Sequence, residues 1–386
     1  MKKILRSALI AVTLVAMIAG CGKTKVAPMP LISRGAPAYT NDTGKDAKLP
    51  SLANNAGYGD AWRSSGTPSP KKPIWLAYDL SGAPAPARIK ALLVWYNEDT
   101  SPYDHTLITA IKNPGYNNVG SYTIDANPAP GGKVPETGWV TLVTVAKNRF
   151  HSRQHVLDFN GFNWVRLSAA SADGTKDNMN VSFNMDVYGP SKGTQDDWIF
   201  IGDSITQMAM HHNPMACKAG SGSFSRLINA SCPSNFPVQE NGGTGYMTSA
   251  DGAKHINEWI VMFPGRYVAL SYGTNDAWNG MKPEEFYNNY SIMAGAVLKA
   301  GKIPLIPSIP WSFSQEKIQK NGVELNRQIE RLCSAYPQII KGPDFWNFYR
   351  GRPDLLSKDG VHPSWPDGLF MYRKMWADTA LNKIYK

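Results

Sequence analysis

Two short motifs, far apart in the 386-residue chain, carry the residue types that acyl transfer needs. Ser204 follows an apolar run within the string Gly-Asp-Ser, and a serine at a strand-to-helix turn is held outward. Near the C-terminus, Asp359 lies three residues before His362, close enough for its carboxylate to orient the imidazole. We therefore expect Ser204 to be a nucleophile, His362 a general base and then acid, and Asp359 the group that holds the histidine tautomer.

Acyl transfer also needs donors for the negative charge that develops on the carbonyl oxygen. The glycine-rich residues 240–245 predict a loop that can present backbone amides, and the string Gly-Thr-Asn-Asp places Asn275 at the end of a second apolar run. We expect the amides of Ser204 and Gly245 and the side chain of Asn275 to bind the oxyanion. Gly243 is a rival to Gly245 for the second backbone donor.

Taken in order, the motifs of residues 196–386 resemble those of the SGNH/GDSL hydrolase family, which supplies Ser, Gly, Asn and His in that order. They are Gly202-Asp203-Ser204, then Gly242, Thr244 and Gly245, then Gly273-Thr274-Asn275-Asp276, and last Asp359-Gly360-Val361-His362. The resemblance implies a three-layer α/β/α domain in which Gly245 is the oxyanion glycine and Asp203 and Asp276 serve local structure. It also implies hydrolysis with neither a metal ion nor an organic cofactor.

The periodicity of the C-terminal half predicts elements that can position these motifs. Apolar runs at 198–201, 267–271 and 303–309 indicate buried strands, and an apolar stripe over 283–300 indicates a helix between two of them. Strands and helices that alternate in this way form a mostly parallel sheet with helices on both faces. Catalytic groups of such sheets lie at the carboxyl ends of the strands, so we expect an α/β domain over 191–386 with its site there.

Residues 56–190 have a different pattern, with short apolar or alternating segments between turn signals and no helical period. This pattern is typical of an all-β sandwich. The order of its landmarks, from Asp60-Ala61-Trp62-Arg63 through Trp75 and Trp164 to Asp186-Val187-Tyr188-Gly189, resembles a galactose-binding-like (discoidin-type) jelly roll. Domains of that kind bind carbohydrate or serve as packing modules, and the sequence leaves both roles open.

Residues 1–20 have the features of an export signal. A basic start precedes an apolar stretch that is too short to span a bilayer. The stretch ends in Ile-Ala-Gly-Cys, which resembles a bacterial lipobox, so we expect cleavage before Cys21 and lipidation of its thiol. The alternative is an ordinary signal peptide with an incidental cysteine. Residues 21–55 are polar and lack periodicity, and we expect them to form a tether between a membrane anchor and the folded domains.

Composition and charge exclude several classes of protein. Hydrophobic residues make up 42% of the chain and charged residues 18%, which excludes a disordered chain and a coiled coil. Removal of the signal lowers the formal net charge from +10 to +7, and no run of basic residues concentrates that charge. We therefore expect no nucleic-acid binding. The lipid anchor predicts a location in the bacterial cell envelope, at the outer membrane in a Gram-negative cell.

The cysteines of an exported chain are candidates for a disulfide. Cys217 and Cys232 lie 15 residues apart in a polar stretch, and closing a loop of that length would stabilise the fold by about 3 kcal/mol. No cluster of Cys and His in the sequence indicates a metal site.

Together, the motifs and the domain pair predict a serine esterase that removes acyl groups, above all acetyl groups, from a plant or envelope polysaccharide. The acetyl and polysaccharide parts depend on the resemblance of the domain pair to carbohydrate esterases. Trp278 and Trp365 flank the Asn and His motifs, where they either line a substrate cleft or pack in the interior. A lipase, a thioesterase or an O-acyltransferase would use the same motifs. A further alternative is a carbohydrate-binding lipoprotein with an inactive hydrolase domain.

Overall fold

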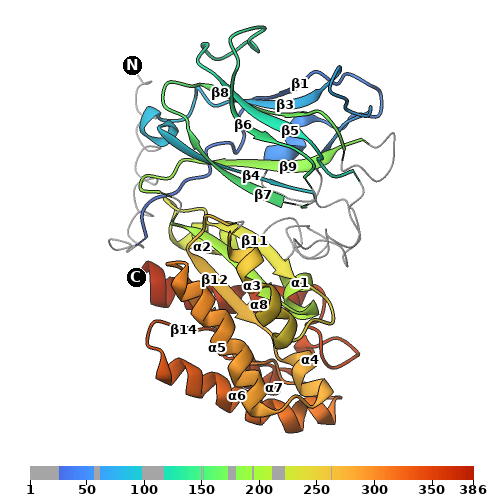
Figure 1. The fold of residues 1–386 in the computed structure, drawn as a ribbon, viewed down its shortest axis with the longest axis vertical. Coiled ribbons are helices and arrows are strands. Elements are labelled where there is room, and N and C mark those ends of the chain that lie inside the picture. The colour runs from blue at the N-terminus through green and yellow to red at the C-terminus, as the bar shows by residue number, and fades with distance from the viewer. Residues whose placement is uncertain are drawn as a thin grey trace, which may run out of the picture.

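The structure is a computed structural model that describes residues 26–55, 61–97, 117–148, 150, 152–172, 180–193, 195–210, 222–261 and 263–386. Within these residues the chain forms an antiparallel β-sandwich followed by an α/β domain (Figure 1). The sandwich occupies the upper part of Figure 1, and the parallel sheet with its helices occupies the lower part. The predicted order, all-β first and α/β second, is confirmed.

The α/β domain is built on a five-stranded parallel sheet in the order β11-β10-β12-β13-β14. These strands are β10 (Asp197–Gly202), β11 (Val238–Gly243), β12 (Tyr267–Ser271), β13 (Ile303–Ile306) and β14 (Ile340–Lys341). Because β10 lies inside the sheet and is covered on both faces, its sequence is an unbroken apolar run rather than an alternation. The strands predicted at 198–201 and 267–271 are confirmed, and the third is shorter than the predicted 303–309. The loop predicted over 240–245 is wrong for residues 240–243, which belong to β11 and pair with β10.

Helices cover both faces of this sheet, as the alternating side chains of β10 show. Trp198 and Phe200 pack with α1, α2, α7 and α8, whereas Ile199 and Ile201 pack with α3, α4, α5 and α6. The helices of this domain are α1 (Ser204–Ala209), α2 (Phe224–Ser231), α3 (Ser249–Val261), α4 (Thr274–Asn279), α5 (Pro283–Lys299), α6 (Glu316–Ala335), α7 (Phe345–Gly351) and α8 (Asp367–Ala380). The helix predicted to begin at Pro283 is confirmed.

The sandwich consists of two antiparallel sheets, in the orders β1-β3-β8-β5-β6 and β2-β9-β4-β7. Its core contains aromatic side chains such as Trp95 and Tyr122, which pack edge to face with Trp95 Nε1 donating to the Tyr122 hydroxyl at 3.0 Å. The strands are β1 (Ala38–Thr40), β2 (Trp62–Arg63), β3 (Ile74–Asp79), β4 (Lys90–Tyr96), β5 (Tyr122–Asn127), β6 (Val140–Val145), β7 (Ser152–Asp158), β8 (Trp164–Ala169) and β9 (Ser182–Tyr188).

The tether predicted over residues 21–55 is wrong for the part that the structure describes. β1 pairs with β3 of the sandwich, and a short helical turn spans Pro50–Asn54. Val26 and Met29 are buried, and the carbonyl of Met29 accepts a hydrogen bond from the amide of Phe236 at 3.2 Å. The polar composition of this segment is misleading because its backbone groups find partners on strands that are distant in sequence.

The sandwich packs against the α/β domain near strand β11, which is an edge strand of the parallel sheet. An apolar cluster with members from both parts fills this interface, and it consists of Met29, Leu92, Val94, Tyr96, Tyr188, Phe236 and Val238. In the same interface, two buried carboxyls face β7. Gln154 Nε2 donates to Asp197 Oδ1 and Glu240 Oε1 at 3.2 Å each, and the Ser152 hydroxyl donates to Glu240 Oε2 at 2.8 Å.

These interfacial carboxyls make stability depend on pH. Burial raises the pKa of Glu240 from 4.5 to about 8, and the neighbouring Asp197 adds to that shift. Burial likewise raises the pKa of Asp197 from 3.8 to about 7. Both groups therefore hold protons in the folded state at a pH where the unfolded chain has released them. Their contribution to stability is complete below about pH 4 and is lost as the pH rises through 7 to 8.

We expect the melting temperature of Glu240→Gln to fall less than that of the unchanged protein between pH 5 and pH 9. The amide keeps an oxygen that can accept from Ser152 but has no proton to lose in this range. Thermal unfolding followed by circular dichroism at both pH values measures the difference. Glu136→Gln, at an exposed position, should follow the unchanged protein. An equal fall in melting temperature for Glu240→Gln and the unchanged protein would contradict the expectation.

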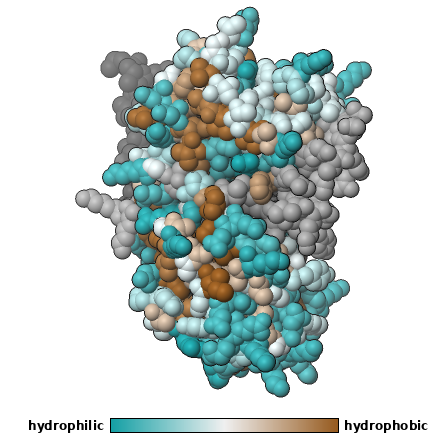
Figure 2. Space-filling view, in the orientation of Figure 1, coloured by the Kyte–Doolittle hydropathy of each residue, from teal (hydrophilic) through white to brown (hydrophobic). Residues whose placement is uncertain are grey.

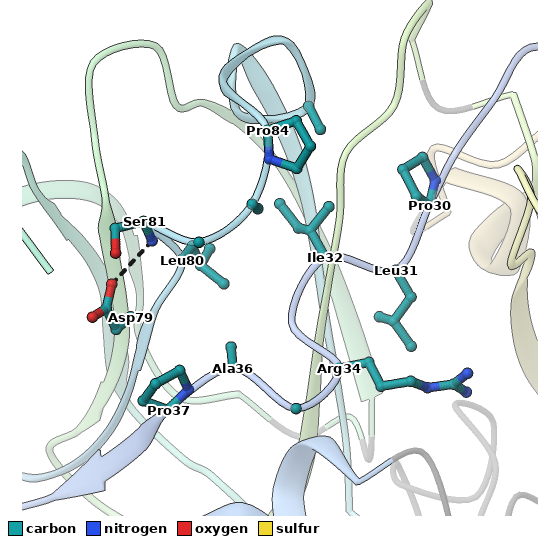
Figure 3. Close-up of a pocket in the computed structure, with 14 residues that line it drawn as sticks. Pro30, Leu31, Ile32, Arg34, Ala36, Pro37, Asp79, Leu80, Ser81 and Pro84 are labelled. Carbon is teal, nitrogen blue, oxygen red and sulfur yellow. Dashed lines mark hydrogen bonds between the residues drawn. The ribbon is translucent and has the colours of Figure 1, made fainter. Parts of the chain in front are cut away.

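A cavity of about 570 Å³ lies in the sandwich, between residues 30–37 and the segment that follows β3 (Figure 3). Its lining is mostly proline, alanine and leucine. The amide of Ser81 donates to Asp79 Oδ1 at 2.9 Å and that of Gly132 donates to Asp79 Oδ2 at 2.7 Å, so both oxygens of the carboxylate at its wall already have partners. None of its lining residues belongs to the predicted hydrolase motifs.

The surface is of mixed polarity. On the face shown in Figure 2, hydrophobic residues gather in separate areas over the sandwich and over the α/β domain, with hydrophilic residues between them. Among the helices that the structure describes, none combines the length and the apolar character that crossing a membrane requires.

Candidate active site

Ser204, His362 and Asp359 meet beyond the carboxyl end of β10. Ser204 Oγ lies 2.8 Å from His362 Nε2, and His362 Nδ1 lies 2.7 Å from Asp359 Oδ2. An ionised carboxylate only accepts hydrogen bonds, so the imidazole proton belongs on Nδ1. Nε2 is then left to accept from the Ser204 hydroxyl. The structure thus brings together three residues that span 158 positions of the chain.

The turn that carries Ser204 is held by its neighbour. Asp203 is the N-cap of α1, and its Oδ1 accepts a hydrogen bond from the amide of Ile205 at 3.0 Å. Burial raises the pKa of Asp203 to about 7, against the opposing effects of the Ile205 amide and of His362. These contacts agree with the local structural role expected for Asp203.

The loop before His362 organises Asp359 as a hydrogen-bond acceptor. Asp359 Oδ1 accepts from the Ser357 hydroxyl at 2.6 Å and from the amides of Val361 and His362 at 2.8 and 3.0 Å. Partial burial raises the pKa of Asp359, but these hydrogen bonds and that of the imidazole outweigh burial and lower it to about 2. Ser357 was not predicted from the sequence, where its only signal is its position two residues before Asp359.

Asn275 lies in the first turn of α4, where a special backbone conformation begins the helix. Gly273 has φ 133°, a value that side chains disfavour, and an added Cβ would lie 2.4 Å from Ile309 Cγ1. Asn275 Nδ2 donates to the carbonyl of Met247 at 2.9 Å. A side-chain amide has two N–H groups, so one remains for an oxyanion. The next residue, Asp276, accepts from Ser249 and so serves local structure as expected.

The predicted oxyanion donor Gly245 already has a partner in this structure. Its amide donates to Gln207 Oε1 at 2.9 Å, and the Gln207 side chain is a buried one on α1. The Gly245 amide can therefore serve an oxyanion only by sharing its proton or by exchanging the Gln207 oxygen for the substrate. Gln207 was not predicted from the sequence, although its position three residues after Ser204 places both on one side of a helix.

Gly243, the rival donor, is required for close packing. Its amide donates to Asn241 Oδ1 at 3.0 Å, and a Cβ added to it would lie 2.2 Å from the backbone nitrogen of Gln207. At Gly245 the nearest atom to such a Cβ is the Gln207 side-chain oxygen at 3.4 Å.

We therefore expect Gly243→Ala to destabilise the protein by about 1–3 kcal/mol, because the methyl group would push α1 away from β11. Gly245→Ala should lower the free energy of unfolding by less than half as much, since its methyl group meets only a side-chain atom. Chemical denaturation of both variants measures the two free energies of unfolding. Equal losses would show that close packing does not distinguish the two glycines.

Two predicted site residues, Cys21 and Cys217, fall outside the described part of the chain. Cys232 is described and is buried at the end of α2. Its pairing with Cys217 stays a prediction. Within the described ranges there is no group of three or more His, Cys, Asp or Glu side chains placed to hold a metal ion.

The site is open to solvent. The side chain of His362 is 27% exposed and that of Asp359 is 49% exposed. Trp278 and Trp365, which flank the Asn and His motifs, are both exposed and so are not packed in the interior. A large substrate can therefore approach the nucleophile without entering the interior of the domain.

Residues 200–365, which contain all of these motifs, match the model of the GDSL-like lipase/acylhydrolase family, and this part of the chain is a domain of that family. The protein is accordingly a carboxylic ester hydrolase. No curated protein sequence matches the chain.

The chain is similar to several solved structures, each over half of its length or less. The lipase/acylhydrolase from Enterococcus faecalis is 20% identical, with 49% of this chain and 97% of that chain covered and a TM-score of 0.40. Axe2, an acetylxylan esterase from Geobacillus stearothermophilus, is 19% identical, with 50% and 95% covered and a TM-score of 0.39. Chitosan-binding module 1 of a chitosanase/glucanase from Paenibacillus sp. IK-5 is 17% identical, with 42% and 99% covered and a TM-score of 0.30.

Proposed function

We propose that this ester hydrolase removes acetyl groups from a polysaccharide by a Ser-His-Asp mechanism. The observation that carries the mechanism is the unbroken chain of hydrogen bonds from Ser204 Oγ through both imidazole nitrogens of His362 to Asp359. In this order the three groups form a nucleophile, its base and the group that orients the base.

In the first half of the reaction, Ser204 Oγ attacks the carbonyl carbon of the ester while its proton passes to His362 Nε2. The negative charge on the carbonyl oxygen is stabilised by the Ser204 amide, the remaining N–H of Asn275 and, where Gln207 yields, the Gly245 amide. The tetrahedral intermediate then collapses, and the imidazolium protonates the leaving sugar oxygen. An acyl-enzyme on Ser204 remains.

In the second half, water replaces the sugar. His362 Nε2 takes a proton from the water, whose oxygen attacks the acyl carbon. Collapse of this second intermediate releases acetate as the proton returns to Ser204 Oγ. Throughout, the carboxylate of Asp359 stabilises the imidazolium and keeps Nδ1 as the donor, a role favoured by its low pKa of about 2.

The polymeric nature of the substrate is supported by the exposure of the site. Half of the Asp359 side chain and a quarter of the His362 side chain face solvent, so the reacting atoms lie near the surface of the domain. Such a surface suits a small acyl group carried on a large, hydrated chain. The sandwich that precedes this domain supplies a second module. Its sequence resembles a galactose-binding-like jelly roll, and we propose that it binds carbohydrate.

The test is acetate release from acetylated xylan and from O-acetylated peptidoglycan by the purified protein, with Ser204→Ala as the blank. A series of p-nitrophenyl esters from acetate to decanoate runs in parallel. We expect acetate from at least one polymer and a preference for the shortest ester. Activity on long esters alone would contradict the deacetylase and favour a lipase, and acetyl transfer to a sugar acceptor in place of hydrolysis would favour an O-acyltransferase.

We also propose that the protein is exported and anchored in the cell envelope through a lipid on Cys21. The support is the sequence at residues 1–21, with its basic start, apolar stretch and terminal Ile-Ala-Gly-Cys. Growth of the expressing bacterium with a clickable fatty acid should label the unchanged protein but not Cys21→Ser. Equal labelling of the two would contradict the anchor.

A further inference from the structure

Exposed aromatic side chains gather around the candidate site. Most rings of the described residues are buried, and large exposed aromatics are few: Tyr246, Trp278, Phe313, Tyr336 and Trp365. Tyr246, Trp278 and Trp365 lie within three residues of a predicted catalytic or oxyanion residue. Phe313 lies in a segment that is hydrogen-bonded to the loop of Asp359. Tyr336 lies elsewhere. Exposed apolar surfaces of this kind commonly mark binding sites.

Tyr246 directly follows Gly245 and is 87% exposed, with a φ of 66°. A left-handed backbone at a tyrosine costs free energy, and its exposed ring recovers little of that cost by packing. The turn is nevertheless held firmly on both sides of the ring. The Gly245 amide donates to Gln207, and the Met247 carbonyl accepts from Asn275. The held turn therefore presents the ring to solvent next to Gly245, a proposed oxyanion donor.

Trp278 lies one helical turn after Asn275 on α4 and is 44% exposed. Residues three apart on a helix lie on the same side, which places the indole on the side of the helix that carries Asn275. The helix is also held by Asn321 on α6, whose Nδ2 donates to the carbonyl of Ala277 at 2.8 Å. Through Asn275 and Met247, α4 is also joined to the turn that presents Tyr246.

Trp365 lies three residues after His362 and is 60% exposed. Phe313 is exposed on a neighbouring segment, where its amide donates to the carbonyl of Gly360 at 3.2 Å. The adjacent Ser314 hydroxyl donates to the carbonyl of Asp359 at 2.5 Å. These two rings therefore accompany the histidine loop, whereas Tyr246 and Trp278 accompany the oxyanion segments.

We propose that Tyr246, Trp278 and Trp365 form a stacking platform for the sugar rings of a glycan chain whose acetyl ester lies at Ser204. This inference depends on the proposed polysaccharide esterase function and names how the polymer is held. One face of a pyranose ring presents C–H groups that pack on an aromatic face, while its hydroxyl groups remain hydrated at the rim. Because the rings are spread over the oxyanion segments and the histidine loop, sugar residues next to the acetylated one can bind as well.

The chemistry of the three side chains favours a glycan over a lipid surface. Tyr and Trp combine an apolar face with a polar O–H or N–H, which suits a ligand that is itself part apolar and part hydroxylated. A surface that inserts into a membrane would carry exposed aliphatic side chains. Among the described residues of α1, α4 and the loops after β11 and around His362, the one large exposed aliphatic side chain is Met208.

The test is binding of acetylated xylan to the Ser204→Ala protein, which cannot consume the ligand, by affinity electrophoresis and calorimetry. Tyr246→Ala, Trp278→Ala and Trp365→Ala are each added to it. Tyr336→Ala is the matched control, because Tyr336 is as exposed as Trp278 but lies at the end of α6. We expect each platform variant to raise Kd for the polymer about 3- to 10-fold, as loss of one aromatic contact does, and the control to leave it unchanged.

Three results would overturn the platform. The first is a Kd in the platform variants equal to that of the parent. The second is an equal loss in Tyr336→Ala. The third is binding to phosphatidylglycerol vesicles, lost in the same variants, without binding to the polymer. Failure of the proposed function is separate, because it is read from acetate release by the protein with Ser204 intact. Binding without acetate release would sink the deacetylase alone, and hydrolysis of p-nitrophenyl acetate without polymer binding would sink the platform.

Discussion

Replacement of Ser204 by alanine is expected to lower kcat for ester hydrolysis by about 10⁴- to 10⁶-fold, the range seen when a nucleophile of this kind is removed. The reason is that no other hydroxyl is placed to receive the acyl group at His362 Nε2 among the hydrogen bonds of the described residues. Initial rates with p-nitrophenyl acetate at enzyme concentrations high enough to see the residual rate measure the loss.

Stability should change little in this variant. The Ser204 hydroxyl contacts His362, which remains fixed by Asp359 after the hydroxyl is removed. Ser291→Ala is the matched control, because that serine bonds to a carbonyl of its own helix, α5, away from the motifs. We expect the control to keep activity within twofold. A Ser204→Ala protein that retains more than one hundredth of the activity would remove Ser204 from its proposed role.

Replacement of Asp359 by asparagine is expected to lower kcat by about 10³- to 10⁴-fold. Asparagine keeps the size of the side chain and one acceptor oxygen, but its amide N–H₂ cannot accept from His362 Nδ1. If the asparagine oxygen stays with Ser357 and the backbone amides, its N–H₂ faces the imidazole and favours the tautomer that carries the proton on Nε2. That tautomer cannot take the proton of Ser204.

The ionisation of Asp359 also affects how the stability and the activity of the unchanged protein depend on pH. Because the pKa of Asp359 is lowered from 3.8 to about 2, the carboxylate stays ionised in the folded state throughout the range in which most proteins remain folded. Its hydrogen bonds contribute stability that is present above about pH 4 and is lost as the pH falls through about 2. An acid limb of kcat/KM above pH 4 therefore reports a group other than Asp359.

Asp354→Asn is the matched control for Asp359→Asn. Asp354 is an exposed carboxylate five residues earlier, paired with Arg352 at 2.6 Å, and its loss should leave kcat within twofold. Steady-state rates from pH 5 to 9 separate a loss of kcat from a displaced pH profile. If Asp359→Asn keeps more than a tenth of the activity, Ser204 and His362 act as a dyad and the proposed role of Asp359 is wrong.

Much of the α/β domain could be predicted from local patterns. Apolar runs indicated β10 and β12, and Pro283 indicated the start of α5, because burial on both faces and the first turn of a helix each impose their own residue types. Strand β7 was not predicted. Its sequence is polar at Ser152 and Gln154 because those side chains bond to buried carboxyls of the other part of the chain, which no local pattern reveals.

The residue types and the order of the motifs were enough to indicate acyl chemistry, because a nucleophile, a base, an acid and amide donors have few other uses in that combination. Their geometry depended on the fold, since Ser204 and His362 are 158 residues apart and meet only through the parallel sheet. Long-range packing also decided that Gly245 donates to Gln207 and that residues 26–55 belong to the sandwich and its interface. Exposure of Trp278 and Trp365 is likewise a tertiary property, because whether an aromatic ring packs or faces solvent depends on which segments cover it.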